Sequence, residues 1–303
     1  AEAAEAAAAW ASAQPRTEAP LLWLHAASAG ELAGAVPVIR VLRERTPELR
    51  IAITVSSPSA LLDARSLAPD FAGYAPLDTL SECAGMISAL APDALVFAKL
   101  DIWPGLSRAA HRAGVPLGLI NGTVRPDSSR LRSPTRQFLR STYARLDAVG
   151  VVGAADAEAL GLLGVEPGRI RITGDAAFDQ ALARVRTARA SGGQLLPART
   201  PDRVRLIGGS TWPADEDVLL RVARELGPRL DLVLVPHEPS AEALARIDDA
   251  CRVALGESPR LWSRLEQTSD DAARLPLVVD TVGQLAELYL EGDLSLMGGA
   301  FDA

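Results

Sequence analysis

The stretch that decides the fold is Leu21-Leu22-Trp23-Leu24-His25-Ala26-Ala27-Ser28-Ala29-Gly30-Glu31. Its first four residues form an apolar run of the length of a buried strand. Residues 28–31 turn the chain, and Leu32 to Arg45 has the apolar spacing of an amphipathic helix. A strand that enters a helix through a turn of small residues is where open α/β sheets bind ligands. Glu31 is therefore the first candidate for chemistry.

Two interpretations of Glu31 compete. In the first, Ser28 and Glu31 form a capping box, in which each side chain satisfies a free backbone N–H group of the other residue. In the second, the carboxylate lies at the positive end of a helix, stays ionised and takes a proton as a general base. The S-x-x-E spacing alone favours the cap, because it is common at helix starts.

The rest of the chain repeats this alternation of strand and helix. Candidate strands in the first part are 51–55, 74–77, 94–98, 117–120, 149–152 and 170–175. Residues 188–202 break the pattern with glycines and prolines, and candidate strands resume at 204–207, 232–235, 277–279 and 294–297. Such alternation indicates βαβ units and parallel sheets.

The predicted fold class is therefore α/β, with two Rossmann-like domains that face an interdomain cleft. The predicted bounds are 1–187 for the first domain, 188–202 for a linker and 203–303 for the second domain. We expect the second domain to be incomplete at its C-terminus, because the chain ends just after a strand-like run and a glycine pair.

The composition narrows the functional classes. The 303 residues carry a net charge of −7, which argues against a nucleic-acid partner. The two cysteines and three histidines are scattered and match no metal-ligand spacing, so no metal site is predicted. No apolar run is long enough for a transmembrane helix, and residues 1–13 do not resemble a signal peptide. An arginine-rich region from Arg125 to Arg145 is either a solvated helix face or a surface for an anionic partner.

Candidate ligand-binding residues follow the strands of the second half. A turn at Gly208, Gly209, Ser210, Thr211 and Trp212 would bring backbone N–H groups and hydroxyls to a phosphate, although it could equally be an ordinary strand-to-helix turn. After the next strand, His237 could donate to a phosphate and Glu238 could accept from a sugar hydroxyl. Gly298 and Gly299 follow the last strand, so small residues again lie at the carboxyl edge of the predicted sheet.

In the first half, Lys99 and Asp101 follow the strand at 94–98. Lys99 could hold a carboxylate or phosphate of a substrate, and Asp101 could orient it. The alternative is a structural ion pair at a strand end. The chain has no G-x-x-x-x-G-K-[ST] run and no G-x-G-x-x-G after the first strand, which disfavours a kinase and a dinucleotide-dependent oxidoreductase.

With these residues placed, the sequence resembles the 3-deoxy-D-manno-octulosonic acid (Kdo) transferase family of lipopolysaccharide synthesis, from about Leu22 to Gly299. The resemblance rests on residues 25–31, Trp103-Pro104, Thr173-Gly174-Asp175, Gly209-Ser210-Thr211, Val235-Pro236-His237-Glu238-Pro239 and Asp280-Thr281-Val282-Gly283-Gln284-Leu285. Many members have Glu-x-Glu-Leu-Trp-Pro at residues 99–104 and Pro-Arg-His-Pro at residues 236–239. These departures leave open which cation meets the donor phosphate.

The resemblance implies a GT-B fold and an inverting, metal-independent transfer of Kdo from CMP-Kdo to a lipid A precursor, without another cofactor, at the cytoplasmic face of the inner membrane. It implies that Glu31 is the general base, with Lys99 and Asp101 beside it. Ser28, Gly30 and Arg125 would lie on the acceptor side, and the candidates of the second half would hold the donor. The alternatives are a GT-B sugar-nucleotide epimerase or hydrolase, and a non-catalytic relative that binds a sugar nucleotide.

Overall fold

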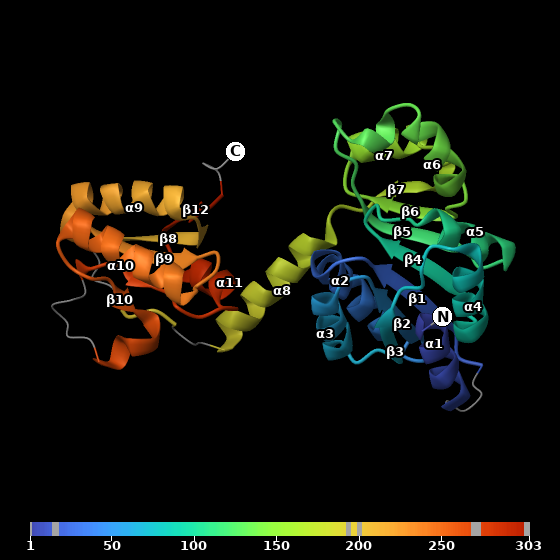
Figure 1. Cartoon of the computed structure of the whole chain (residues 1–303), viewed down its shortest axis with the longest axis horizontal. Coiled ribbons are helices and arrows are strands. Elements are labelled where there is room, and N and C mark those ends of the chain that lie inside the picture. Colours follow the sequence, from blue (N-terminus) through green and yellow to red (C-terminus); the bar gives the residue numbers. More distant parts are fainter. Residues whose placement is uncertain (1, 14–17, 192–194, 199–201, 268–273, 300–303) are drawn as a thin grey trace. The chain divides into compact units, whose positions relative to one another are not determined.

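The computed structural model describes residues 2–13, 18–191, 195–198, 202–267 and 274–299. The chain divides into two compact units, Ala1–Gln180 and Ala181–Ala303, and each has its own parallel sheet (Figure 1). The division lies inside helix α8 (Ala176–Ser191), which also overlaps the start of the predicted linker. The overlap arises because alanine and arginine, both good helix formers, dominate that stretch. The predicted interdomain cleft stays a prediction.

The first unit contains seven parallel strands in the order β3-β2-β1-β4-β5-β6-β7. The third strand begins at Phe71 and not at the predicted residue 74, because Phe71 is buried whereas Leu77 is 71% exposed. The bounds are β1 Leu21–Ala26, β2 Arg50–Val55, β3 Phe71–Tyr74, β4 Ala94–Ala98, β5 Leu117–Gly122, β6 Ala148–Val151 and β7 Ile170–Ile172.

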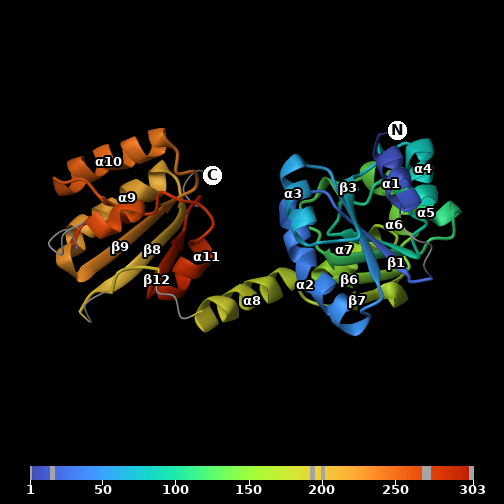
Figure 2. The same cartoon turned by 90° about the horizontal axis from the view of Figure 1, so that it is seen from below.

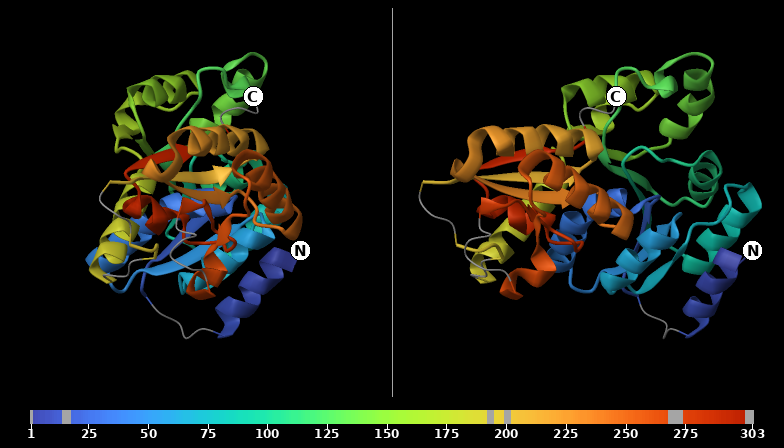
Figure 3. Two further views of the ribbon diagram at one scale, coloured as in Figure 1. Left: turned by 90° about the vertical axis from the view of Figure 1, so that its left-hand side faces the viewer. Right: turned by 60° about the vertical axis from the view of Figure 1, so that its left-hand side comes forward.

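Helices cover both faces of this sheet. Helices α2 (Ala29–Arg45) and α3 (Pro58–Ser66) cover one face, and the other carries α4 (Leu80–Leu90), α5 (Pro104–Arg112), α6 (Thr135–Tyr143) and α7 (Ala154–Leu162). Alternate residues of β1 point to the two faces of the sheet, each of which has its own apolar core. Leu24 packs under α2, and Trp23 packs toward α4 and α5. Figure 3 shows α1 (Glu2–Ala13) beside α4. Trp10 of α1 packs against Phe71, with 5.6 Å between the ring centroids.

The second unit contains five parallel strands in the order β10-β11-β9-β8-β12. Helices α9 (Pro213–Leu226) and α10 (Ala241–Leu255) cover one face, and the short α11 (Leu285–Leu288) lies on the other (Figure 2). Strand β10 is absent from the candidate strands, because its two residues are too few to show a sequence period. The bounds are β8 Val204–Thr211, β9 Leu230–Pro236, β10 Arg260–Leu261, β11 Leu277–Val278 and β12 Leu294–Met297.

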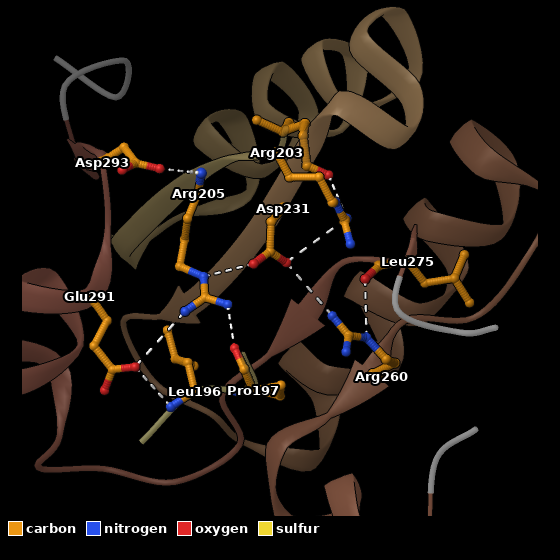
Figure 4. Close-up of polar contacts among 10 residues, drawn as sticks. Leu196, Pro197, Arg203, Arg205, Asp231, Arg260, Leu275, Glu291 and Asp293 are labelled. Carbon is orange, nitrogen blue, oxygen red and sulfur yellow. Dashed lines mark hydrogen bonds and ion pairs between the residues drawn. The ribbon is translucent and has the colours of Figure 1, made fainter. Parts of the chain in front are cut away.

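A buried ion network lies at the amino ends of β8 and β9 (Figure 4). Asp231, 5% exposed, accepts a hydrogen bond from Arg205 Nε at 2.6 Å. Its other oxygen lies 3.9 Å from Arg203 and 3.8 Å from Arg260. Arg205 Nη2 also donates to the carbonyl of Pro197 at 2.6 Å. The network therefore ties the segment before β8 to the sheet of this unit, at the edge opposite to the carboxyl ends of the strands.

Candidate functional site

Glu31 lies in the first turn of α2, just beyond the carboxyl end of β1. Ser28 is the N-cap: its Oγ accepts from the Glu31 N–H at 3.3 Å, and Glu31 Oε2 accepts from the Ala27 N–H at 2.8 Å. The expected cap is therefore present, although the carboxylate returns to Ala27 and not to Ser28. Glu31 Oε1 makes no hydrogen bond with any residue that the structure describes. Capping thus uses one oxygen and leaves the other for a ligand.

The pKa of Glu31 is raised. Burial is the largest cause, and the negative charge of Asp101 adds to it. The hydrogen bond from Ala27 and the charges of Lys99 and Arg130 act in the opposite direction. The first unit therefore places Lys99, Asp101 and Arg130 within electrostatic range of Glu31. A raised pKa makes the carboxylate a stronger base at neutral pH.

The loop after β4 is held by side chains from elsewhere in the unit. Asp101 Oδ2 accepts from Trp103 Nε1 at 3.1 Å, and Asp101 Oδ1 lies 4.0 Å from Arg130. Lys99 forms no ion pair with the described residues, so the alternative of a structural Lys99–Asp101 pair is wrong, and Asp101 lies near Arg130 instead. Lys99 has a backbone φ of +57°, a left-handed conformation that costs a non-glycine residue about 1–3 kcal/mol. Strain of this kind is typical of functional loops.

His25 lies behind this loop, 1% exposed, with its ring 5.1 Å from that of Trp103. Its Nδ1 lies 3.1 Å from Thr54 Oγ1, which accepts from Trp23 Nε1 at 2.8 Å. The Thr54 hydroxyl, with one hydrogen and two lone pairs, can serve either tautomer of the ring, and the other ring nitrogen is Nε2. This buried Nε2 has no hydrogen-bond partner among the described residues. Burial lowers the pKa of His25 to about 4, against the opposing charge of Asp101, so the ring is neutral at pH 7.

This neutral imidazole predicts a pH dependence of stability. Because the pKa of His25 is lowered from 6.5 in the unfolded chain to about 4 in the folded one, the unfolded chain binds the additional proton between these values. The free energy of unfolding should fall by about 3 kcal/mol between pH 6.5 and pH 4 through this group alone. Urea unfolding of the wild type and of His25→Gln measures it, since the variant lacks that decrease. The matched control is His111→Gln on α5, whose side chain is exposed. Parallel curves of unfolding free energy against pH for the wild type and His25→Gln would show that His25 is not held neutral by the fold.

In the second unit, the prediction of a turn at Gly208–Thr211 is wrong. Strand β8 continues through Thr211, and the turn follows at Trp212. A Cβ atom on Gly208 would lie 2.5 Å from Leu219 of α9, and one on Gly209 would collide with the hydroxyl of Tyr289. These glycines therefore allow close packing on the two faces of β8. Their part in donor binding stays a prediction.

Ser210, Trp212 and His237 meet at the carboxyl edge of this sheet. Ser210 has a φ of +54°, where the β8–β9 register shifts, and its Oγ lies 2.8 Å from His237 Nδ1. The rings of Trp212 and His237 stack with centroids 4.8 Å apart and an interplanar angle of 22°. A cavity of about 320 Å³ lies beside them, lined by Thr211, Trp212, Pro213, Pro236, His237, Glu238, Ser240, Glu242, Ala243 and Arg246. The candidates Thr211, Trp212, His237 and Glu238 thus line one cavity.

The end of β12 is joined to the same edge by Asp215. This residue is fully buried, and its Oδ2 accepts from the N–H groups of Trp212 and Gly299, both at 2.9 Å. A Cβ atom on Gly298 would collide with the carbonyl of Ser210. Gly298 and Gly299 therefore lie against the β8–α9 turn. A side chain on Gly298 would push β12 away from it.

The remaining candidates are exposed. Gly30 lies in the first turn of α2 with open space around it, and Arg125 follows β5 and pairs with Asp127 at 3.1 Å. No group of three or more His, Cys, Asp or Glu residues in the described part of the chain could hold a metal ion. Within the same residues, no helix combines the length and the apolarity that a bilayer crossing requires.

Residues 4–180, more than half of the chain, match the family model of 3-deoxy-D-manno-octulosonic-acid (Kdo) transferases. The chain belongs to the Kdo transferase family. The Kdo transferase of Chlamydophila psittaci is 27% identical over 93% of this chain, and the probable mitochondrial Kdo transferase of Arabidopsis thaliana is 28% identical over 94%. The chain spans 64% and 65% of the lengths of these two relatives.

Solved structures identify the fold. UDP-GlcNAc 2-epimerase from Neisseria meningitidis, bound to UDP-GlcNAc, has a TM-score of 0.61 and 15% identity, over 92% of this chain and 77% of the epimerase. MurG of Acinetobacter baumannii has a TM-score of 0.51 and 10% identity, over 92% of this chain and 73% of MurG. Together with the two parallel sheets, these likenesses assign the predicted GT-B fold of two Rossmann-like domains to this Kdo transferase family member.

Sequence patterns missed several residues of both candidate sites. Arg130 appeared only as part of an arginine-rich region, although it pairs with Asp101. His25 lies in the same Kdo transferase motif as Glu31, but its burial could not be read from that motif. In the second unit, Glu216 and Arg246 form an ion pair across 30 positions of sequence. No local pattern could have found that pair, because strand and helix packing bring its members together.

Proposed function

We propose that the full-length protein transfers Kdo from CMP-Kdo to a lipid A precursor in lipopolysaccharide synthesis, without a metal ion or other cofactor. The observation that carries this proposal is the Glu31 carboxylate. It lies half-buried at the carboxyl edge of the first sheet, with a raised pKa and one oxygen free of hydrogen bonds to the described residues. Membership of the Kdo transferase family supports the donor and the acceptor class.

In the proposed reaction, Glu31 accepts the proton of an acceptor hydroxyl. The hydroxyl oxygen forms a bond to the anomeric carbon of Kdo, and the bond from that carbon to the phosphate oxygen breaks with inversion. CMP leaves with the electron pair and the negative charge. The strained Lys99 and the Asp101–Arg130 pair lie within electrostatic range of the base and would orient the acceptor.

The donor side of the proposal is the cavity beside the β8–α9 turn. Trp212 offers a ring that is 43% exposed and stacked on His237, and Ser210 offers a hydroxyl. The first turns of α9 and α10 border the same cavity, and the positive ends of the two helix dipoles favour a negative charge there. Together these groups would stabilise the charge that develops on the departing phosphate.

The test is the reaction itself. The full-length protein is incubated with CMP-Kdo and a tetraacylated lipid A precursor, and the lipid is weighed by mass spectrometry. We expect a lipid product heavier by one or more Kdo residues, together with released CMP. Release of CMP without a heavier lipid would indicate a hydrolase. Turnover of a UDP-sugar without any use of CMP-Kdo would indicate an epimerase.

We also propose a peripheral contact with the cytoplasmic face of the inner membrane. On α6, Arg136 and Arg140 have no ion-pair partner among the described residues, and Phe138 between them is 71% exposed. The pKa of nearby Arg145 is lowered by burial and by the charges of Arg108 and Arg112 on α5. The two arginines lie one turn apart on the same side of α6 and suit an anionic lipid surface, whereas Phe138 points to another side of the helix.

Removal of both charges in Arg136→Gln/Arg140→Gln should weaken binding to anionic vesicles by about 30-fold. The expected loss is about 1 kcal/mol for each arginine near the surface. Co-sedimentation with vesicles of phosphatidylcholine and phosphatidylglycerol measures it. The matched control is Arg40→Gln/Arg45→Gln, which removes two exposed arginines from α2 on the other face of the sheet. Equal binding by the two double variants would contradict the proposed contact.

A further inference from the structure

The cavity beside Trp212 contains one cation among its described lining residues, Arg246 of α10. Its other charged lining residues are Glu238 and Glu242, which oppose a phosphate. The loop after β9, residues 237–240, contains neither arginine nor lysine. The loop therefore supplies no guanidinium, and the positive charge of the cavity comes from the helix that follows it.

Arg246 is held in place by a buried carboxylate. Its Nη1 pairs with Oε2 of Glu216, whose side chain is 1% exposed, and the Arg246 side chain is 40% exposed. The other oxygen, Glu216 Oε1, accepts from the hydroxyl of Thr211 at 3.2 Å. Thr211 ends β8, Glu216 lies in the first turns of α9, and Arg246 lies on α10. This chain of contacts fixes the guanidinium beside the β8–α9 turn.

The fixed guanidinium keeps donors available for a ligand. Arginine has five N–H groups, and only Nη1 of Arg246 has a partner among the described residues. A guanidinium binds phosphate oxygens with two parallel hydrogen bonds, so it suits a phosphate better than an ammonium does. Glu216 offsets part of the positive charge of Arg246. It also holds the Arg246 side chain in place beforehand, so ligand binding need not order that side chain.

We propose that Arg246 is the residue that binds the donor phosphate in this chain, and that Glu216 is a positioning residue that aims it. The proposal rests on the proposed function, and specifies which cation that function uses. Arg246 would hold the phosphate of CMP-Kdo before transfer and the phosphate of CMP after the glycosidic bond to it has broken. The nucleoside would be held by other groups.

The experiment compares CMP with cytidine, which differ by the phosphate alone, in calorimetric titrations of the full-length protein. We expect Arg246→Gln to weaken CMP binding by about 10- to 100-fold, the range for a lost charge-assisted hydrogen bond, and to leave cytidine binding within about twofold. The CMP affinity of Arg246→Lys should lie between those of the wild type and Arg246→Gln. Arg252→Gln is the matched control, because Arg252 lies on the same helix, is 61% exposed, pairs with Asp248 at 3.0 Å and does not line the cavity.

Two further variants separate positioning from folding. Glu216→Gln should weaken CMP binding and spare cytidine binding, whereas a purely structural role would weaken both. Loss of Arg246 alone leaves Glu216 buried without a partner, so the double variant Glu216→Gln/Arg246→Gln, which removes both charges, should fold and show the same selective loss of CMP binding.

The outcomes are distinct. If the wild type binds CMP no more tightly than cytidine, or if Arg246→Gln binds CMP as the wild type does, the assignment of Arg246 is overturned, and the transfer assay still decides the function. If the wild type binds neither ligand and makes no lipid product, the proposed function fails together with the inference. A selective loss of CMP binding in Arg246→Gln, with Arg252→Gln unchanged, supports the assignment.

Discussion

Replacement of Glu31 by Gln is expected to lower the turnover of Kdo transfer by about 100- to 10,000-fold, the range for loss of a general base. The amide cannot accept the proton of the acceptor hydroxyl. Its oxygen can still accept from the Ala27 N–H, which Glu31 Oε2 binds at 2.8 Å, so the start of α2 should be retained. Initial rates with CMP-Kdo and a lipid A precursor, at saturating concentrations of both, measure the effect.

The matched control for this variant is Glu82→Gln. Glu82 has the same place in α4 that Glu31 has in α2: its N–H donates to the N-cap Thr79 Oγ1 at 3.4 Å. A role in helix capping alone would give both variants similar, small effects on turnover. Binding of CMP should be unchanged in Glu31→Gln, because the donor cavity lies in the other unit. Full turnover by a folded Glu31→Gln variant would remove the proposed base.

Replacement of Asp231 by Asn is expected to destabilise the second unit by about 3–5 kcal/mol. Asp231 is the shared partner of Arg203, Arg205 and Arg260, and the side chain of Arg205 is only 5% exposed (Figure 4). Without the carboxylate, buried guanidinium groups would lose their nearest negative charge. The measurement is hydrogen exchange of the β8 and β9 amides, which reports the free energy of opening in this unit.

The control for this prediction is Asp248→Asn on α10. Asp248 pairs with Arg252 at 3.0 Å, but the two side chains are 32% and 61% exposed. Exposed pairs contribute about 0–1 kcal/mol, so this variant should change the exchange very little. Equal protection in Asp231→Asn and Asp248→Asn would show that the buried network does not stabilise the unit.

The sequence predicted more of the site around Glu31 than of the cavity beside Trp212, and particular residues show why. Ser28 and Glu31 lie within one turn of helix, so their spacing predicted a cap that the structure contains. Gly208 and Gly209 have the composition of a phosphate-binding turn, but they lie in a strand. What decides this is the packing of Leu219 and Tyr289 against them, and neither residue is close to them in sequence.

From the sequence alone came the α/β class, the two units, the family and the place of Glu31 after the first strand. These follow from local properties: apolar periodicity, helix caps and short motifs act over a few neighbouring residues. Only the tertiary structure decided that His25 is neutral and buried, that Asp101 pairs with Arg130, and that Glu216 pairs with Arg246. The physical reason is that burial and ion pairing depend on distances in space, and strand pairing and helix packing set these distances between residues far apart in the chain.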